Sequence, residues 1–189
     1  MLRYLQMIVI FLGLSTAIFA QKYKTFLPAA AHFESYLPII KDKKVGLVVN
    51  QTSLVGKKHL LDTLLSRGVQ VTKIFGPEHG FRGKADAGSH LENEIDESTK
   101  LPIISLYGKH NKPSKEDLAG LDYLIFDIQD IGVRFYTYSS TLHLVMEACA
   151  ENNVPLLVLD RANPHANEVA GPVLNRKFSS FVGMNPIPL

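Results

Sequence analysis

The feature that most constrains the fold is a repeated alternation of continuous apolar runs with amphipathic segments. The apolar runs are rich in β-branched residues and lack the polar alternation of a half-exposed strand, which is typical of strands covered on both faces. Five runs are predicted strands: 44–50, 69–75, 102–107, 123–128 and 154–159. Three intervening segments are predicted helices: 59–67, 114–121 and 137–152. This order predicts an α/β fold, a mostly parallel sheet with helices on both faces.

Composition excludes several classes of protein. The chain has 189 residues of which 46% are apolar, enough for a globular domain with a real core. Its formal charge of +2 is too small to indicate a nucleic-acid partner or an anionic membrane surface. No G-x-G-x-x-G follows the first predicted strand, and neither a Walker loop nor a G-x-S-x-G motif is present. We therefore expect no nucleotide cofactor and no α/β-hydrolase chemistry.

The first 20 residues have the layout of a secretory signal peptide. Arg3 precedes an apolar run at 7–14, and small or apolar residues at 17–20 lead to a polar Gln-Lys pair. The run is short for a membrane span, although a retained anchor is the alternative. The lone Cys149 permits no internal disulfide, which suits a bacterial envelope protein. We predict cleavage near Ala20, a mature domain over 21–189 without a stable membrane span, and an exported protein that is periplasmic or secreted.

The loop at 76–83, with the sequence GPEHGFRG, is the most informative candidate for a site. It places Glu78, His79 and Arg82 among three glycines and a proline, directly after a predicted strand. Charged groups are costly to bury, and open α/β sheets bind ligands beyond the carboxyl ends of their strands. The loop is therefore a predicted ligand site, with a charged surface turn as the alternative.

Polar residues also follow the other predicted strands. Asn50 ends the first, Asp130 and Arg134 follow the fourth, and Asn163 follows the fifth. Because parallel strands share one carboxyl edge, we expect these groups to converge with the 76–83 loop. Tyr136 can stack on a sugar face while its hydroxyl forms a hydrogen bond.

Two alternatives apply to this second group of residues. Arg134 would instead neutralise Asp127 or Asp130, and Tyr136 would be a core residue. No cluster of Cys or His has the spacing of a zinc site, so no metal is expected. Carboxylates remain as the candidate catalysts, and glycoside hydrolysis is the reaction that a pair of carboxylates serves best.

Five motifs in one order resemble a known family. They are GLVVNQTS at 46–53, FGPEHGFRG at 75–83, LPIISLYG at 101–108, FDIQDIGVRFYTY at 126–138, and an LDRANP…GP region at 159–172. Together they are similar to the NamZ-type exo-β-N-acetylmuramidases, long catalogued only as a domain of unknown function. The similarity extends over essentially the whole predicted mature chain.

The resemblance implies a Rossmann-like N-terminal domain followed by a smaller C-terminal domain, with the active cleft between them. Such proteins continue for about another domain's length, so we expect this chain to be the N-terminal piece of a longer protein. The family's activity is exo-cleavage of the β-1,4 bond between a terminal N-acetylmuramic acid and N-acetylglucosamine in peptidoglycan fragments. No nucleotide or metal is implied.

The resemblance also places the candidate catalytic glutamate at Glu78, and we expect it to act as a general acid desolvated by Phe75 and Phe81. Asp130 is the candidate second carboxylate, or else orients Arg134. The predicted substrate-binding residues are Asn50, His79, Arg82, Arg134, Tyr136 and Asn163. Two other functions remain open: a non-catalytic module that binds muropeptides, and a different Rossmann-like enzyme acting on an anionic small molecule.

Overall fold

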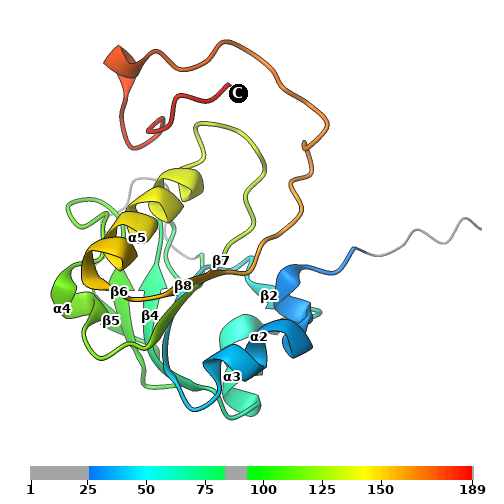
Figure 1. The fold of residues 1–189 in the computed structure, drawn as a ribbon, viewed down its shortest axis with the longest axis vertical. Helices are drawn as coiled ribbons and strands as arrows, with labels where there is room; N and C mark the ends of the chain where they lie inside the picture. Colours follow the sequence, from blue (N-terminus) through cyan, green and yellow to red (C-terminus); the bar gives the residue numbers. More distant parts are fainter. Residues whose placement is uncertain (1–25, 84–92, 189) are drawn as a thin grey trace, which may run out of the picture.

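A six-stranded sheet forms the centre of the molecule (Figure 1). The structure is a computed structural model that describes residues 26–83 and 93–188, so the predicted signal peptide at 1–20 lies outside the described residues. In spatial order the strands are β5 (Glu94–Ile95), β6 (Pro102–Ser105), β4 (Gln70–Gly76), β1 (Lys44–Val49), β7 (Tyr123–Asp127) and β8 (Leu156–Val158). All neighbouring pairs are parallel except β5 with β6.

The five parallel strands have the order of a doubly wound fold. Numbered along the chain, their spatial order is 3-2-1-4-5, and the direction of winding reverses between β1 and β7. A crevice forms at such a topological switch point, outside the carboxyl ends of the strands. The topology therefore locates the candidate site before any side chain is considered.

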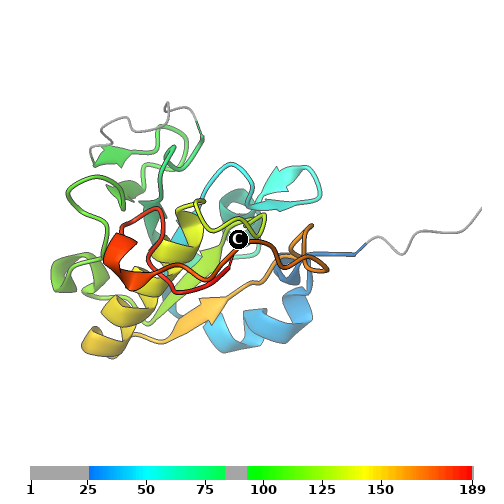
Figure 2. The ribbon, with the colours of Figure 1, turned by 90° about the horizontal axis from the view of Figure 1, so that it is seen from above.

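Helices cover both faces of the sheet (Figures 1 and 2). Buried side chains of α2 (Phe33–Ile40) and α3 (Leu60–Ser66) belong to one apolar cluster, and those of α4 (Lys115–Leu118) and α5 (Tyr138–Asn152) belong to a second. The remaining elements are short: η1 (Ala29–Ala31), η2 (Arg176–Phe178) and a hairpin of β2 (Leu54–Val55) and β3 (Lys58–His59). The predicted Rossmann-like α/β fold is confirmed.

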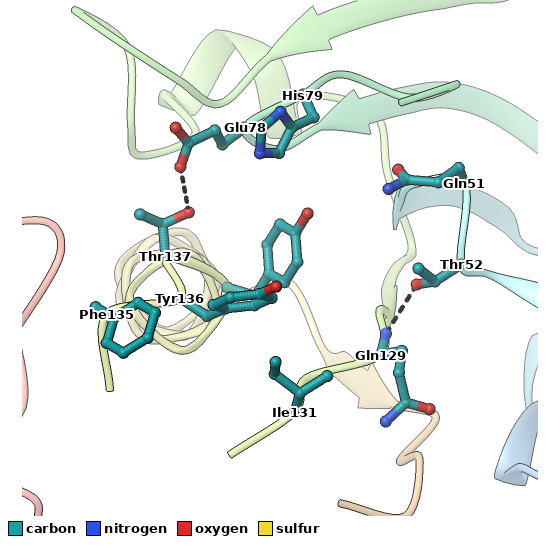
Figure 3. A pocket seen from close by; sticks show the side chains of 10 residues that line it. Gln51, Thr52, Glu78, His79, Gln129, Ile131, Phe135, Tyr136 and Thr137 are labelled. Atoms are coloured by element: carbon teal, nitrogen blue, oxygen red, sulfur yellow. Dashed lines mark hydrogen bonds between the residues drawn. The ribbon is translucent and has the colours of Figure 1, made fainter. Parts of the chain in front are cut away.

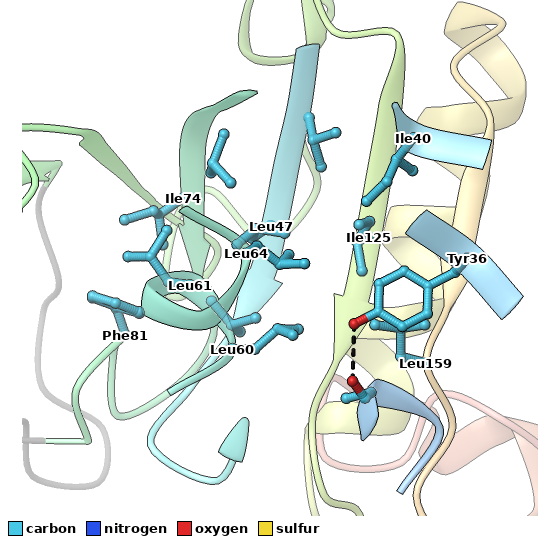
Figure 4. Packing of buried hydrophobic residues seen from close by; sticks show 14 residues of the cluster. Tyr36, Ile40, Leu47, Leu60, Leu61, Leu64, Ile74, Phe81, Ile125 and Leu159 are labelled. Atoms are coloured by element: carbon cyan, nitrogen blue, oxygen red, sulfur yellow. Dashed lines mark hydrogen bonds between the residues drawn. The ribbon is translucent and has the colours of Figure 1, made fainter. Parts of the chain in front are cut away.

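Strand β1 contributes to both clusters, which explains its continuous apolar sequence. Val45 and Leu47 pack into the cluster under α2 and α3 (Figure 4), whereas Val48 packs into the one under α5. Gly46 also faces that second cluster, where an added Cβ would lie 2.8 Å from the side chains of Leu121 and Leu124. Real Cβ atoms essentially never approach carbons so closely, so a larger residue at position 46 would force the two leucine side chains to shift.

Several elements end one or two residues short of their predicted bounds, and two have only half the predicted length. Helix α4 covers Lys115–Leu118 rather than 114–121, because Ser114 and Asp117 form a reciprocal capping box at its start and Gly120 adopts a left-handed φ of 78° just beyond its end. Strand β8 covers Leu156–Val158 rather than 154–159, since Pro155 has no N–H to donate to a ladder.

Residues 159–188 are mostly irregular and arch above the sheet and α5 in Figure 1. Arg134 holds this segment: its Nη1 donates to the carbonyl oxygens of Pro172 and Ile187, each at 2.8 Å. Phe178 remains 65% exposed, as expected for an apolar segment with little to pack against. None of the helices in the described ranges, 26–83 and 93–188, has the length and apolar character needed to cross a membrane.

Candidate functional site

A cavity of about 430 Å³ opens at the switch point (Figure 3). We call it the switch-point cavity. Its walls come from the segments that follow β1, β4 and β7 and from the start of α5. The lining residues are Gln51, Thr52, Glu78, His79, Gln129, Ile131, Phe135, Tyr136, Thr137 and Tyr138. Its volume falls within the range of small-molecule sites.

The loop at 76–83 folds tightly back over the end of β4. A Cβ on Gly76 would lie 3.1 Å from the backbone nitrogen of Phe81, so the loop lies in tight contact with the end of β4. His79 and Gly80 have left-handed φ values of 69° and 75°, and the Gly80 N–H donates to the Pro77 carbonyl at 2.8 Å. The clustered glycines thus permit a compact turn that presents Glu78 and His79 to the cavity.

Phe81 anchors this turn in the core. It is 3% exposed, and its ring meets the imidazole of His59 edge-on with centroids 5.0 Å apart. Phe75 is fully buried in the α4 and α5 cluster. Both predicted neighbours of Glu78 are therefore core side chains, and neither is among the residues that line the cavity.

Glu78 is held by a hydroxyl group from another element. Its Oε2 accepts a hydrogen bond from Thr137 Oγ1 at 2.7 Å, across the cavity wall shown in Figure 3. A hydrogen bond between the Tyr107 hydroxyl and Glu78 raises the pKa of Tyr107, with burial and the negative charge of Glu78 adding to the effect. Among the described residues, Glu78 is the one carboxylate that lines the cavity.

Asn50 lies behind the cavity wall and fixes the position of a residue that lines it. It is fully buried, and its Oδ1 accepts from Thr52 N at 2.9 Å and from Thr52 Oγ1 at 2.6 Å. Its carbonyl contacts His59 Nε2 at 2.9 Å, and burial lowers the pKa of His59, so a neutral ring donates there. Thr52 Oγ1 in turn accepts from Gln129 N at 3.0 Å, which joins the segments after β1 and β7.

Asp130 and Asn163 both support the loop after β7. Asp130 Oδ1 accepts from Gly132 N at 2.6 Å, while its buried Oδ2 has no hydrogen-bond partner within the described residues. Asn163 packs so closely on Gly132 that a Cβ there would lie 2.3 Å from Asn163 Nδ2. Gly132 also has a left-handed φ of 77°, a backbone conformation that favours glycine. Neither polar residue is among those that line the cavity.

The two predicted arginines contact other groups. Arg82 Nη2 pairs with Asp96 at 3.0 Å and its guanidinium lies over the Phe81 ring, whereas Arg134 binds the carbonyls of residues 172 and 187. The alternative that Arg134 neutralises Asp127 or Asp130 is wrong. The partner of Asp127 is Arg161, whose position after β8 places it beside the end of β7. Of the eight predicted site residues, Glu78, His79 and Tyr136 line the cavity.

The predicted site omits seven lining residues, but several of them adjoin a predicted one in sequence. Gln51 follows Asn50, Gln129 precedes Asp130, and Thr137 follows Tyr136. Phe135, Tyr136 and Tyr138 form a chain of edge-on aromatic contacts, with successive centroids 6.0 Å apart. Tyr136 is 38% exposed and Tyr138 is buried, so the outer rings are available for stacking.

Asp96 is expected to contribute to stability in a pH-dependent way. Burial alone would raise the pKa of this carboxyl, but hydrogen bonds from Ser98, Thr99 and Arg82 outweigh it and lower the pKa to about 2. An unfolded aspartate titrates near 3.9, so the stabilisation is complete above about pH 4 and is lost as pH falls towards 2. Asp96→Asn should cost roughly 2 kcal/mol at pH 7 in urea unfolding.

The same substitution should cost little near pH 2, where the folded wild-type carboxyl is already about half protonated and most of its pH-dependent stabilisation is lost. Glu97→Gln, at an exposed neighbouring position, is the matched control and should leave the unfolding midpoint unchanged at both pH values. An equal loss for Asp96→Asn at pH 7 and pH 2 would show that the charge does not contribute.

The described residues contain no group of three or more His, Cys, Asp or Glu side chains arranged to hold a metal ion. Cys149 is buried on α5, where burial raises the pKa of its thiol to about 11. A thiol of that kind is a small apolar core group rather than a nucleophile.

Comparison with known proteins identifies relatives of this chain. Residues 45–189 match the family model for the N-terminal part of the exo-beta-N-acetylmuramidase NamZ. The peptidoglycan beta-N-acetylmuramidase NamZ of Bacillus subtilis (strain 168) is 46% identical over 157 residues, which are 82% of this chain and 38% of that protein.

Two crystal structures of DUF1343 family proteins from Bacteroides fragilis NCTC 9343 have the same fold. One matches with a TM-score of 0.75 at 44% identity and the other with 0.77 at 39% identity. Each alignment covers 86% of this chain and 42% or 41% of the solved one, so the chain spans about two fifths of the length of these relatives. The chain belongs to the NamZ exo-beta-N-acetylmuramidase family and corresponds to its N-terminal part.

Proposed function

We propose that this chain carries the catalytic glutamate of a glycosidase that releases terminal N-acetylmuramic acid from β-1,4-linked peptidoglycan fragments. The observation that carries the proposal is the position of Glu78 in the switch-point cavity of a chain 46% identical to a named peptidoglycan muramidase. The proposed partners are peptidoglycan-derived disaccharides and muropeptides. Export to the bacterial envelope, where such fragments arise, is part of the same proposal.

The composition of the cavity wall supports a sugar ligand. Gln51 and Thr52 present an amide and a hydroxyl group along one side, and Tyr136 and Phe135 offer aromatic surface on another (Figure 3). Sugars present hydroxyl and acetamido groups at their edges and C–H groups on their faces. A wall that combines neutral hydrogen-bonding groups with exposed rings suits both.

Glu78 is the group proposed to exchange the proton at the glycosidic oxygen. A general acid must come within hydrogen-bond reach of that oxygen, and Glu78 is partly exposed at the cavity wall. His79 lies beside it and is the proposed contact for the sugar's polar substituents. Asp130 stays a candidate second carboxylate, with its Oδ2 unpaired within the described residues but outside the cavity lining.

The direct test uses two isomeric disaccharides with the full-length gene product. We expect hydrolysis when N-acetylmuramic acid is the non-reducing sugar and none when N-acetylglucosamine is, because an exo-muramidase binds and releases the terminal non-reducing sugar. Mass spectrometry of the released monosaccharides measures both. Binding without cleavage of either isomer would favour the muropeptide-binding module. Neither binding nor cleavage would favour an enzyme with a different anionic substrate.

A further inference from the structure

Thr137 stands at the start of α5 but does not cap it. It occupies the residue before the helix, where a threonine side chain commonly accepts a hydrogen bond from the first turn. Here no such bond forms, and the backbone has helical angles of φ −72° and ψ −7° rather than the extended ones that favour capping. The hydroxyl is therefore available for another partner.

That partner is Glu78. The Thr137 hydroxyl donates to Glu78 Oε2 at 2.7 Å, and Thr137 itself is 5% exposed, so its side chain has little freedom to move elsewhere. The first turn of α5 contains no acidic residue of its own. Glu78 supplies a carboxylate to this helix end from a segment 59 residues away, which favours its position there electrostatically.

The backbone of Thr137 is fixed independently of this contact. Its carbonyl accepts from Thr141 N at 2.8 Å and from Thr141 Oγ1 at 3.1 Å, so the residue is bound into the first turn of a 15-residue helix. A hydroxyl on such a rigid element defines both the position and the rotation of the carboxyl that it holds. The Tyr107 hydroxyl adds a second contact to Glu78 from the segment after β6.

We propose that Thr137 is a positioning residue that fixes the Glu78 carboxyl for proton transfer by joining the 76–83 loop to the start of α5. This inference rests on the proposed function for its catalytic consequence, but the loop anchoring itself does not. Thr137 need not touch the substrate. It acts through Glu78, so its loss should lower kcat more than it changes KM.

The experiment compares Thr137→Val with Thr137→Ser in the full-length protein. Valine keeps the shape and removes the hydroxyl, whereas serine keeps the hydroxyl. We expect Thr137→Val to lower kcat about 10- to 100-fold with KM within about twofold, and Thr137→Ser to remain within about threefold of wild type in both. Thr63→Val is the matched control, since Thr63 is a buried helical threonine whose hydroxyl binds only the His59 carbonyl among its described contacts.

A second readout requires no substrate. The Gly80 N–H is bonded to Pro77 O within the loop, so its hydrogen exchange reports how firmly the loop is held. We expect Thr137→Val to accelerate exchange at Gly80 by about tenfold, and Thr137→Ser and Thr63→Val to leave it unchanged.

The outcomes separate this inference from the proposed function. If wild type cleaves the disaccharide and Thr137→Val keeps its kcat, or loses no more than Thr63→Val, the positioning role is overturned. If wild type cleaves neither disaccharide, the proposed function fails, and hydrogen exchange at Gly80 is then the test of whether Thr137 anchors the loop. Faster exchange in Thr137→Val supports the anchoring of Glu78, and unchanged exchange overturns it.

Discussion

Glu78→Gln is expected to lower kcat on the muramic-acid disaccharide by about 10²- to 10⁴-fold, the usual contribution of a general acid or base. Glutamine keeps the length and shape of the side chain but cannot deliver a proton. Its amide oxygen can still accept from Thr137 Oγ1, so the 76–83 loop should keep its conformation. Substrate affinity, measured by calorimetry, should therefore change far less than turnover.

Glu151→Gln is the matched control for this substitution. Glu151 lies on the exposed side of α5 and its carboxylate contacts Lys112, far along the helix from Thr137. Its replacement removes one carboxylate from the far end of α5 without touching the switch-point cavity, so kcat should remain within about twofold of wild type. Near-normal turnover by Glu78→Gln would remove this glutamate from the mechanism, whatever the fold resembles.

The fold was largely predictable because strands covered on both faces have continuous apolar sequences that are easy to recognise. In the run at 69–75, Val71 and Ile74 pack under α3 while Phe75 packs under α5, although Gln70, Thr72 and Lys73 make this run less continuously apolar than β1. The observed strand, Gln70–Gly76, differs from the prediction by one residue at each end. Element ends depend on individual caps and prolines, such as those at α4 and β8, and so are harder to place.

The position of the site was predictable for a topological reason, but its composition was not. Glycine clustering and charge identified the 76–83 loop, and the shared edge of parallel strands located it. Which side chains face inward depends on the turn at His79 and Gly80, whose left-handed angles direct Glu78 to Thr137 and leave Arg82 to reach Asp96. The pairing of Arg82 with Asp96 spans 14 residues and has no local sequence signal.

Arg134 and Arg161 are a second case in which the sequence does not reveal which charged residues pair. Both follow strands that end at one edge, and their residue type is identical, so the sequence offers no basis for deciding which one neutralises Asp127. Strand pairing determines the partner. Because β8 pairs with β7, Arg161, three positions after β8, lies beside the end of β7. Arg134 instead leaves β7 on a loop that contacts residues 172 and 187.

Arg161→Met is expected to destabilise the protein by about 3–5 kcal/mol, the usual cost of leaving a buried charge without its partner. Arg161 Nε and Nη2 bind the two carboxylate oxygens of Asp127 at 2.5 and 2.9 Å, and Nη2 also binds the Leu54 carbonyl at 3.0 Å. The Asp127 side chain is fully buried and the Arg161 side chain is 8% exposed. Urea unfolding followed by circular dichroism measures the loss.

The pH dependence of the stability loss and a double variant test whether the loss comes from the unpaired charge of Asp127. Burial raises the pKa of Asp127, and Arg161 opposes that rise. Without Arg161 the folded protein favours the protonated carboxyl more strongly, while the unfolded chain ionises near pH 3.9, so the loss should be larger at pH 8 than at pH 5. Adding Asp127→Asn should recover part of it, whereas Lys112→Met, which breaks an exposed pair with Glu147 and Glu151, should change stability little. A loss that is independent of pH and unrelieved by Asp127→Asn would instead implicate the packing of the arginine side chain.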